Sequence, residues 1–135
     1  MATTREAVQI GDIVPTLTVD DLQKSITFYE ALGFAIDERW EEKGTLLGVM
    51  LRAGKSRIGL NQDDWKKGRD RKKGIGVRLS ISTSTPGSVD EIAKRAKNAG
   101  ITLKSEPRDT EWKSRAFEVS DPSGFLLTIF SEASA

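Results

Sequence analysis

The sequence predicts an α+β fold in which a β-α-β-β-β module occurs twice within one domain of 135 residues. Three observations predict it: two helix-like segments with matching caps, three strand-like segments after each of them, and a hairpin-like turn before the last strand of each set. Chance similarity of two α/β segments is the alternative, but it would not make caps, lengths and hairpins agree. We expect module one at about 10–62, a connecting loop at 63–74 and module two at about 75–131.

Module one begins with a strand-like run at 13–19. Asp21 is the expected helix N-cap, because its carboxylate can accept hydrogen bonds from the exposed amides of the first turn. Gly33 ends the helix twelve residues later, since glycine adopts the left-handed cap without strain. Apolar residues at helical spacing give this helix one buried face: Leu22, Ile26, Tyr29 and Leu32. Three further strands are expected at about 34–41, 45–53 and 56–62.

Module two repeats this order. Val77, Leu79 and Ile81 alternate with polar residues, as in a half-buried strand at 76–82. Ser88 and Glu91 have the spacing of a capping box, and Gly100 ends the helix twelve residues after Ser88. The strands that follow are expected at about 101–107, 112–120 and 125–131, with a Pro- and Gly-containing turn at 120–124.

Composition excludes several kinds of chemistry. The chain has 21 basic and 20 acidic residues, so no global field attracts polyanions. It contains no cysteine and no histidine, which excludes disulfides and Ser/His or Cys/His nucleophile pairs. No apolar run has the length of a signal peptide or a membrane span. We therefore expect a cytoplasmic protein that does not interact with membranes and has no cofactor.

The segment 63–74 contains six basic residues, three aspartates and a single aromatic residue, Trp65. The simplest interpretation is an exposed, solvated connection between the modules. A phosphate or nucleic-acid patch is the alternative, but the aspartates dilute the positive charge and one tryptophan gives little base stacking. The glycines also lack the spacing of a P-loop. We expect no nucleic-acid partner.

Two motifs indicate a family. The first consists of Val19-Asp-Asp-Leu22 followed by Phe28-Tyr-Glu-Ala-Leu-Gly-Phe34, and the second is Asp121-Pro-Ser-Gly-Phe-Leu-Leu-Thr-Ile-Phe130. At this separation, and with the duplication, they resemble the glyoxalase / bleomycin-resistance / extradiol-dioxygenase (vicinal oxygen chelate) superfamily over about residues 10–131. The resemblance implies curved mixed sheets that form a half-barrel cleft with the helices outside. It also implies a homodimer, in which the subunits sometimes share clefts.

Enzymes of that superfamily hold a metal at the cleft floor, with a histidine or equivalent on each first strand and a glutamate on each last strand. Alignment with this chain places residues without suitable donors at the four positions: Val14, Gly59, Gly76 and Thr128. We therefore expect no metal at the floor of this cleft. Oxygen ligands for a different divalent ion could come only from carboxylates elsewhere: Glu41, Glu118, Asp63 and Asp64.

Strand alternation predicts which side chains face the cleft, and Arg78 is the most informative of them. Its guanidinium can hold a ligand carboxylate in a bidentate pair, or it can form an internal salt bridge to Glu118. The three tryptophans can be pocket walls, core residues or dimer contacts, and Trp65 is the preferred pocket residue because its loop is otherwise charged. The predicted ligand-binding residues are Arg78, Asn61, Trp65, Thr128, Trp40, Trp112 and Glu118.

These residues favour binding of a small organic molecule, such as an antibiotic or an aromatic metabolite, in a metal-free cleft. The alternative is a lyase, isomerase or dioxygenase-type enzyme that uses an unusual metal or acid–base chemistry, for instance through Glu41 or Glu118. A third interpretation is an interaction module with a degenerate cleft. The sequence names no catalytic residue and no specific ligand.

Overall fold

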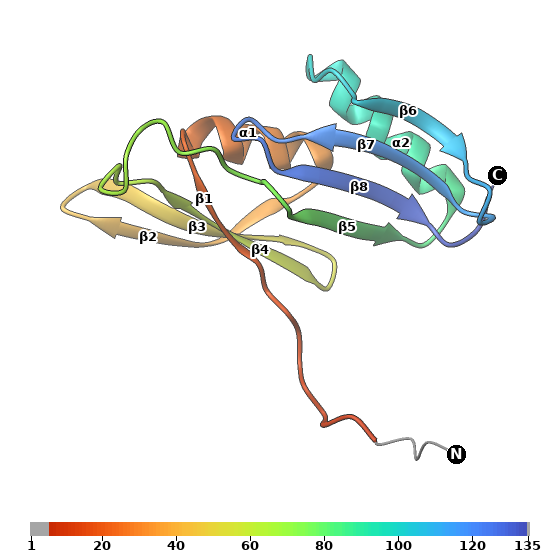
Figure 1. Cartoon of the computed structure of the whole chain (residues 1–135), viewed down its shortest axis with the longest axis horizontal. Helices are drawn as coiled ribbons and strands as arrows, with labels where there is room; N and C mark the ends of the chain where they lie inside the picture. The colour runs from red at the N-terminus through yellow and green to blue at the C-terminus, as the bar shows by residue number, and fades with distance from the viewer. Residues whose placement is uncertain (1–5, 135) are drawn as a thin grey trace.

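The computed structural model describes residues 6–134, and it contains two mixed four-stranded sheets with one helix in each module. Figure 1 shows the two sheets side by side. Sheet one has the spatial order β1 (Thr16–Val19), β4 (Ser56–Gln62), β3 (Thr45–Ala53) and β2 (Ala35–Glu42). Sheet two has the order β5 (Arg78–Thr83), β8 (Leu126–Ser131), β7 (Arg115–Ser120) and β6 (Ser105–Asp109). The duplicated α+β architecture predicted from the sequence is confirmed.

Both sheets are paired in the same way. The first strand of each module runs parallel to its last strand, and all other neighbours are antiparallel. Thr16 pairs with Gly59 in sheet one, and Ser80 pairs with Thr128 in sheet two. This register gives a residue-by-residue correspondence between the modules, in which residue 16 matches residue 80.

Helix α1 (Leu22–Leu32) begins and ends as predicted, with Asp21 accepting the Lys24 N–H at 3.1 Å and Gly33 at φ 114°. Helix α2 (Pro86–Asn98) begins three residues earlier than predicted. Thr85 is its N-cap and accepts the Ser88 N–H at 3.1 Å, so the capping box at Ser88 was wrong. Pro86 suits the first helical position because the amide it lacks would have no partner inside the helix.

The strands confirm the predicted bounds of β3 and β4, whereas β6 and β7 begin at residues 105 and 115 rather than 101 and 112. Val77 was predicted to pack beneath the helix, but it lies just before β5 and is 50% exposed. Alternation holds where pairing is continuous: Ile58, Leu60, Leu127 and Ile129 are buried, as predicted.

The core lies between the sheets and the helices. Module one contributes an aromatic cluster in which Tyr29 lies edge-on to Phe28 and Phe34, with ring centroids 5.0 and 5.9 Å away. Helix α2 instead presents small buried residues, Ala93 and Ala96, to its sheet. The two helices contact each other, which joins the modules on the side opposite the open sheet faces. None of the helices described is both long and apolar enough to cross a membrane.

Candidate functional site

The face of each sheet opposite its helix, here called the inner face, is where the family would place a ligand. In sheet one Trp40 pairs with Gly48, which pairs with Asn61. The equivalent residues in sheet two are Arg108, Ala116 and Phe130, which pair in the same order. The two inner faces therefore share one geometry and differ in side chains.

The inner face of sheet one is filled by its own atoms. A Cβ atom added to Gly48 would lie 2.6 Å from Asn61 Oδ1 and 2.8 Å from the Leu60 carbonyl oxygen. A Cβ atom added to Gly59 would lie 3.0 Å from Thr16 Oγ1. The Leu60 carbonyl belongs to the backbone, so Gly48 is required by close packing, whereas a side chain at Gly59 would need only a small shift of Thr16.

The inner face of sheet two is hollow. It contains a cavity of about 340 Å³ that all four strands and the turn at 110–114 help to line. Its walls combine hydroxyl groups, two guanidinium groups, a carboxylate and aromatic rings, as in sites that bind small organic ligands. The residues that matter most for the argument are Arg78, Ser80, Trp112, Glu118, Thr128 and Phe130.

Arg78 is an accessible charge of this cavity. Its Nη1 lies 4.0 Å from Glu118 Oε2, which is the outer limit for an ion pair, and its side chain is 59% exposed. Such a long, exposed contact contributes little to stability. The predicted salt bridge to Glu118 is thus present in a loose form that leaves the guanidinium accessible to a ligand.

Thr128 brings a buried hydroxyl to the cavity. Its Oγ1 is shielded from solvent and has no hydrogen-bond partner among the described residues. A buried hydroxyl without a partner costs free energy, because it gave up its hydrogen bonds to water. A polar ligand atom would supply the missing partner once the side chains that shield the hydroxyl moved aside.

The strand register corrects one of the four expected metal positions. Val14 lies two residues before Thr16, and the residue two before Ser80 is Arg78 rather than Gly76. Gly76 lies outside β5 with φ 77°, so the position predicted for it was wrong. The cause is the predicted start of the strand at residue 76, two residues before β5 begins. A guanidinium therefore occupies the position where a metal-binding relative would carry its ligand.

The residues present do not fit a metal ion. Val14, Gly59, Arg78 and Thr128 offer one neutral hydroxyl and one cation, and neither is a good ligand for a divalent ion. Thr16 also occupies the space next to Gly59. Within residues 6–134, no three side chains of the His, Cys, Asp and Glu types are grouped so that they could hold a metal.

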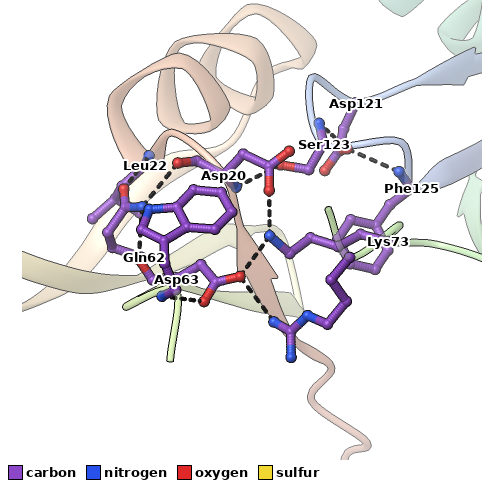
Figure 2. A network of polar contacts seen from close by, with 10 residues as sticks. Asp20, Leu22, Gln62, Asp63, Lys73, Asp121, Ser123 and Phe125 are labelled. Atoms are coloured by element: carbon purple, nitrogen blue, oxygen red, sulfur yellow. Dashed lines mark hydrogen bonds and ion pairs between the residues drawn. The ribbon is translucent and has the colours of Figure 1, made fainter. Parts of the chain in front are cut away.

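A second polar group lies where the modules join, and we call it the junction cluster: Asp20, Asp63, Trp65, Arg71 and Lys73. Figure 2 shows Lys73 between Asp20 and Asp63. Lys73 Nζ contacts Asp63 Oδ2 at 2.8 Å, and the two side chains are only 5% and 4% exposed. The segment 63–74, predicted to be a solvated connection, is instead anchored by buried charges at both ends.

The junction cluster explains where Trp65 lies. Its ring is covered by Lys73 Nζ at 4.6 Å and by the Arg69 guanidinium at 5.1 Å from the ring centroid. Its backbone N–H donates to Asp63 Oδ1 at 2.8 Å. The hydrogen bond from Lys73, followed by that from Trp65, lowers the pKa of Asp63 to about 2.

The cluster continues into module two through the turn at 121–124. The Asp20 N–H donates to Ser123 Oγ at 2.9 Å (Figure 2), and Tyr29 Oη donates to the buried Asp121 at 2.9 Å. Burial, followed by the charge of Asp121, raises the pKa of Tyr29 far above its ordinary value. The family motif at 121–130 thus has a structural task here, which is to fasten module two to α1.

The seven predicted ligand-binding residues fall into three places. The structure brings Arg78, Trp112, Glu118 and Thr128 together in the cavity of sheet two. Trp40 and Asn61 lie on the filled inner face of sheet one, and Trp65 lies in the junction cluster. The sequence analysis did not include Arg108 among the ligand-binding residues, although it lines this cavity. Its alternation along β6 would have indicated it, had the strand been placed correctly.

The comparisons with known proteins agree with this geometry. The profile of the Glyoxalase/Bleomycin resistance protein/Dioxygenase superfamily matches residues 9–129. The chain belongs to this superfamily. No curated protein sequence matches the chain. Members of the superfamily differ in what they bind and catalyse, so membership establishes the fold and leaves the ligand to the site itself.

Solved structures of similar fold come from several bacteria. The hypothetical protein SA1046 from S. aureus is 23% identical with a TM-score of 0.71, and the match covers 92% of this chain and 95% of that one. TioX from Micromonospora sp. ML1 is 20% identical with a TM-score of 0.73, covering 90% and 98%. The virulence protein STM3117 from Salmonella typhimurium is 26% identical with a TM-score of 0.66, covering 92% and 98%.

Proposed function

We propose that the protein binds a small aromatic anion, without a metal, on the inner face of sheet two. The observation that carries this proposal is the cavity lined by Arg78, by Thr128, and by the aromatic rings of Trp112 and Phe130. An antibiotic or an aromatic metabolite with a carboxylate or sulfonate group is the class of ligand that suits these walls. Sequestration in the cytoplasm is the role that this binding would serve.

Each wall of the cavity would contribute a different interaction. Arg78 would form a charge-assisted hydrogen bond with the anionic group, which is stronger than a neutral one. Trp112, with 79% of its surface exposed, and Phe130 would cover the flat faces of an aromatic body. Glu118 would disfavour ligands that place a second anion near β7, and so would add specificity.

We further propose that the protein is a homodimer. Large apolar residues stay exposed on and near both inner faces in a single chain, including Trp40, Leu47, Ile75 and Trp112. Exposed apolar surface of this extent is typical of an interface. A second copy placed over the inner faces would cover these residues and exclude water from the ligand site.

The binding site can be tested with the fluorescent aromatic anion 1-anilinonaphthalene-8-sulfonate. Arg78→Gln should raise the Kd for this probe about tenfold, because the charge-assisted hydrogen bond is lost. Arg52→Gln is the matched control, since Arg52 also lies on a strand of an open sheet but pairs with Asp37 outside the cavity. Trp112→Ala should weaken binding as well. Equal affinity of Arg78→Gln and the wild type would overturn the site.

A further inference from the structure

The second guanidinium of the cavity, that of Arg108, lies on the far side of sheet two from Arg78. The two residues belong to the outermost strands of the sheet, β6 and β5 (Figure 1). Arg78 pairs with Leu126 at the start of β8, whereas Arg108 is level with Phe130, near the end of β8, through Ala116. The two arginines therefore occupy opposite corners of one inner face, and both line the same cavity of about 340 Å³.

A β-bulge in β6 turns Arg108 towards the cavity. From Ser105 to Arg108, three steps along β6 match two steps along β7. The extra residue reverses the alternation of side chains, so Ser105 and Arg108 both line the cavity, and Thr110 follows Arg108 on the same side. In a regular strand Pro107 would take this place. Pro107 instead lines a separate depression beside α2, and a bulge suits it because it has no N–H for the ladder.

Sheet one is regular at the equivalent place. Glu38 and Trp40 pair with Met50 and Gly48, which are two steps apart on each strand. The bulge at this position therefore belongs to the module that has the cavity. Bulges are frequent next to functional sites, where they re-aim a side chain. Here the re-aimed side chain is a cation.

The guanidinium of Arg108 is available to a ligand. Its side chain is exposed, and within residues 6–134 no carboxylate forms an ion pair with it. The neighbouring carboxylate, Asp109, is engaged by Arg115 Nη1 at 3.1 Å. The carboxylate of the cavity, Glu118, lies beside Arg78 instead. An arginine that faces a cavity in this way can hold an anionic group through charge-assisted hydrogen bonds.

We propose that Arg108 is a second anion-binding residue, and that the ligand is an elongated aromatic dianion with one acidic group at Arg78 and the other at Arg108. This inference rests on the proposed function and extends it from one anionic group to two. Glu118, on a strand between the two arginines, repels an anion from the middle of the cavity and so favours charges at the ends. The outermost strands are three strand spacings apart, about 14 Å, which suits a body of two aromatic rings.

Two probes that differ only in the second acidic group test the inference: biphenyl-4-carboxylate and biphenyl-4,4′-dicarboxylate. Calorimetric titration of the wild type should give a Kd about tenfold lower for the dicarboxylate. Arg108→Gln should remove this preference by weakening the dicarboxylate, while the Kd of the monocarboxylate changes less than about twofold. Arg39→Gln, on the outermost strand of sheet one and outside the cavity, is the matched control and should keep the preference.

The outcomes separate this inference from the proposed function. Equal affinity of the wild type for both probes, or a preference that survives Arg108→Gln, would overturn the second anion site and leave binding of one anion at Arg78 intact. A wild type that binds neither biphenyl probe nor anilinonaphthalenesulfonate would overturn both. Arg108→Lys keeps the charge without the planar fork and should keep part of the preference, which a merely structural role of Arg108 does not predict.

Discussion

The two inner faces have the same strand order and register, yet one is filled and the other hollow. Where sheet one packs Trp40 and Asn61 closely around Gly48, sheet two has Arg108, Ala116 and Phe130 around a cavity. At these paired positions the two faces differ in their side chains. Duplication thus allowed one copy to become a packed support and left the other free to bind.

The two modules also differ in the burial and contacts of equivalent residues outside the inner faces. Asp63, which follows β4, is buried in an ion pair, whereas its counterpart Glu132, which follows β8, is exposed. Tyr29 on α1 reaches across to Asp121, whereas its counterpart on α2 is Ala93. At these two positions, module one makes stabilising contacts that the equivalent residues of module two do not make. Substitutions of equivalent residues should show that stability depends on module one and binding on module two.

The largest expected effect comes from Lys73→Met, which would leave Asp63 buried with one cation fewer. Removing one partner of a buried ion pair is costly, so Tm should fall by roughly 10 °C. Lys72→Met, at an exposed neighbouring position, should leave Tm nearly unchanged. Thermal unfolding followed by circular dichroism gives both values. Similar Tm values for the two variants would mean that the junction cluster does not stabilise the fold.

Lowering the pH should remove the stabilisation that the ion pair of Asp63 with Lys73 provides. The pKa of Asp63 is lowered to about 2 in the folded protein, against about 3.9 for an unperturbed aspartate. Because the folded pKa is depressed, the stabilisation is present above about pH 4 and is lost as the pH falls towards 2. In Lys73→Met the pKa of Asp63 should rise, so that its protonation begins at a higher pH. Urea unfolding across this pH range would show the difference.

Enlarging the side chain at equivalent positions of the two inner faces should change the free energy of unfolding by different amounts. Gly48→Ala places a Cβ atom 2.8 Å from the Leu60 carbonyl oxygen, so the backbone must shift, at a cost of about 2 kcal/mol. Ala116→Val, at the equivalent position beside the cavity, should change the free energy of unfolding by less than about 0.5 kcal/mol. Urea denaturation measures both. Equal costs would show that the faces do not differ in packing.

Tyr29→Phe should cost about 1–2 kcal/mol, because Asp121 would keep its burial but lose one donor. A double-mutant cycle with Asp121→Asn isolates the pair, and a coupling free energy near zero would contradict its role. Tyr29 is the only tyrosine in the chain, so ultraviolet absorbance reports its ionisation directly. Its raised pKa means that its contribution is lost above about pH 10 and that tyrosinate should appear only on unfolding.

Thr128→Val should differ from the other substitutions in the sign of its effect on stability. The hydroxyl it removes is buried without a partner, so the free energy of unfolding should stay constant or rise by up to about 1 kcal/mol. Binding of anilinonaphthalenesulfonate should weaken by about 3–10-fold. Thr18→Val, on the inner face of sheet one, should leave binding unchanged. A loss of stability at Thr128 would indicate an unseen structural partner.

Local patterns predicted most of the fold. Period-two alternation identified β4 and β8, and side-chain capping by Asp21 identified the start of α1. The pattern failed at α2, where Ser88 and Glu91 satisfy a capping box but Thr85 and Pro86 begin the helix. A separate error of two residues at the start of β5 hid the equivalence of Val14 and Arg78.

The site was harder to predict than the fold, because it depends on distances between strands rather than on spacing along the chain. Arg78, Glu118 and Thr128 meet only through the register of β5, β7 and β8. The ion pair of Asp63 with Lys73 had no local signal, since seven other charged residues lie between them. Which of several lysines is buried is decided by the packing of the whole junction.

The parallel pairing of β1 with β4 also determines when each part can form during synthesis. Sheet one cannot close until Gln62, the register partner of Val19, has left the ribosome. Sheet two likewise waits for Ser131, the partner of Thr83, and only then can Asp121 meet Tyr29 across 92 residues. Contacts of such high sequence separation make folding slow. During synthesis, module one must therefore remain for some time without its contacts to module two.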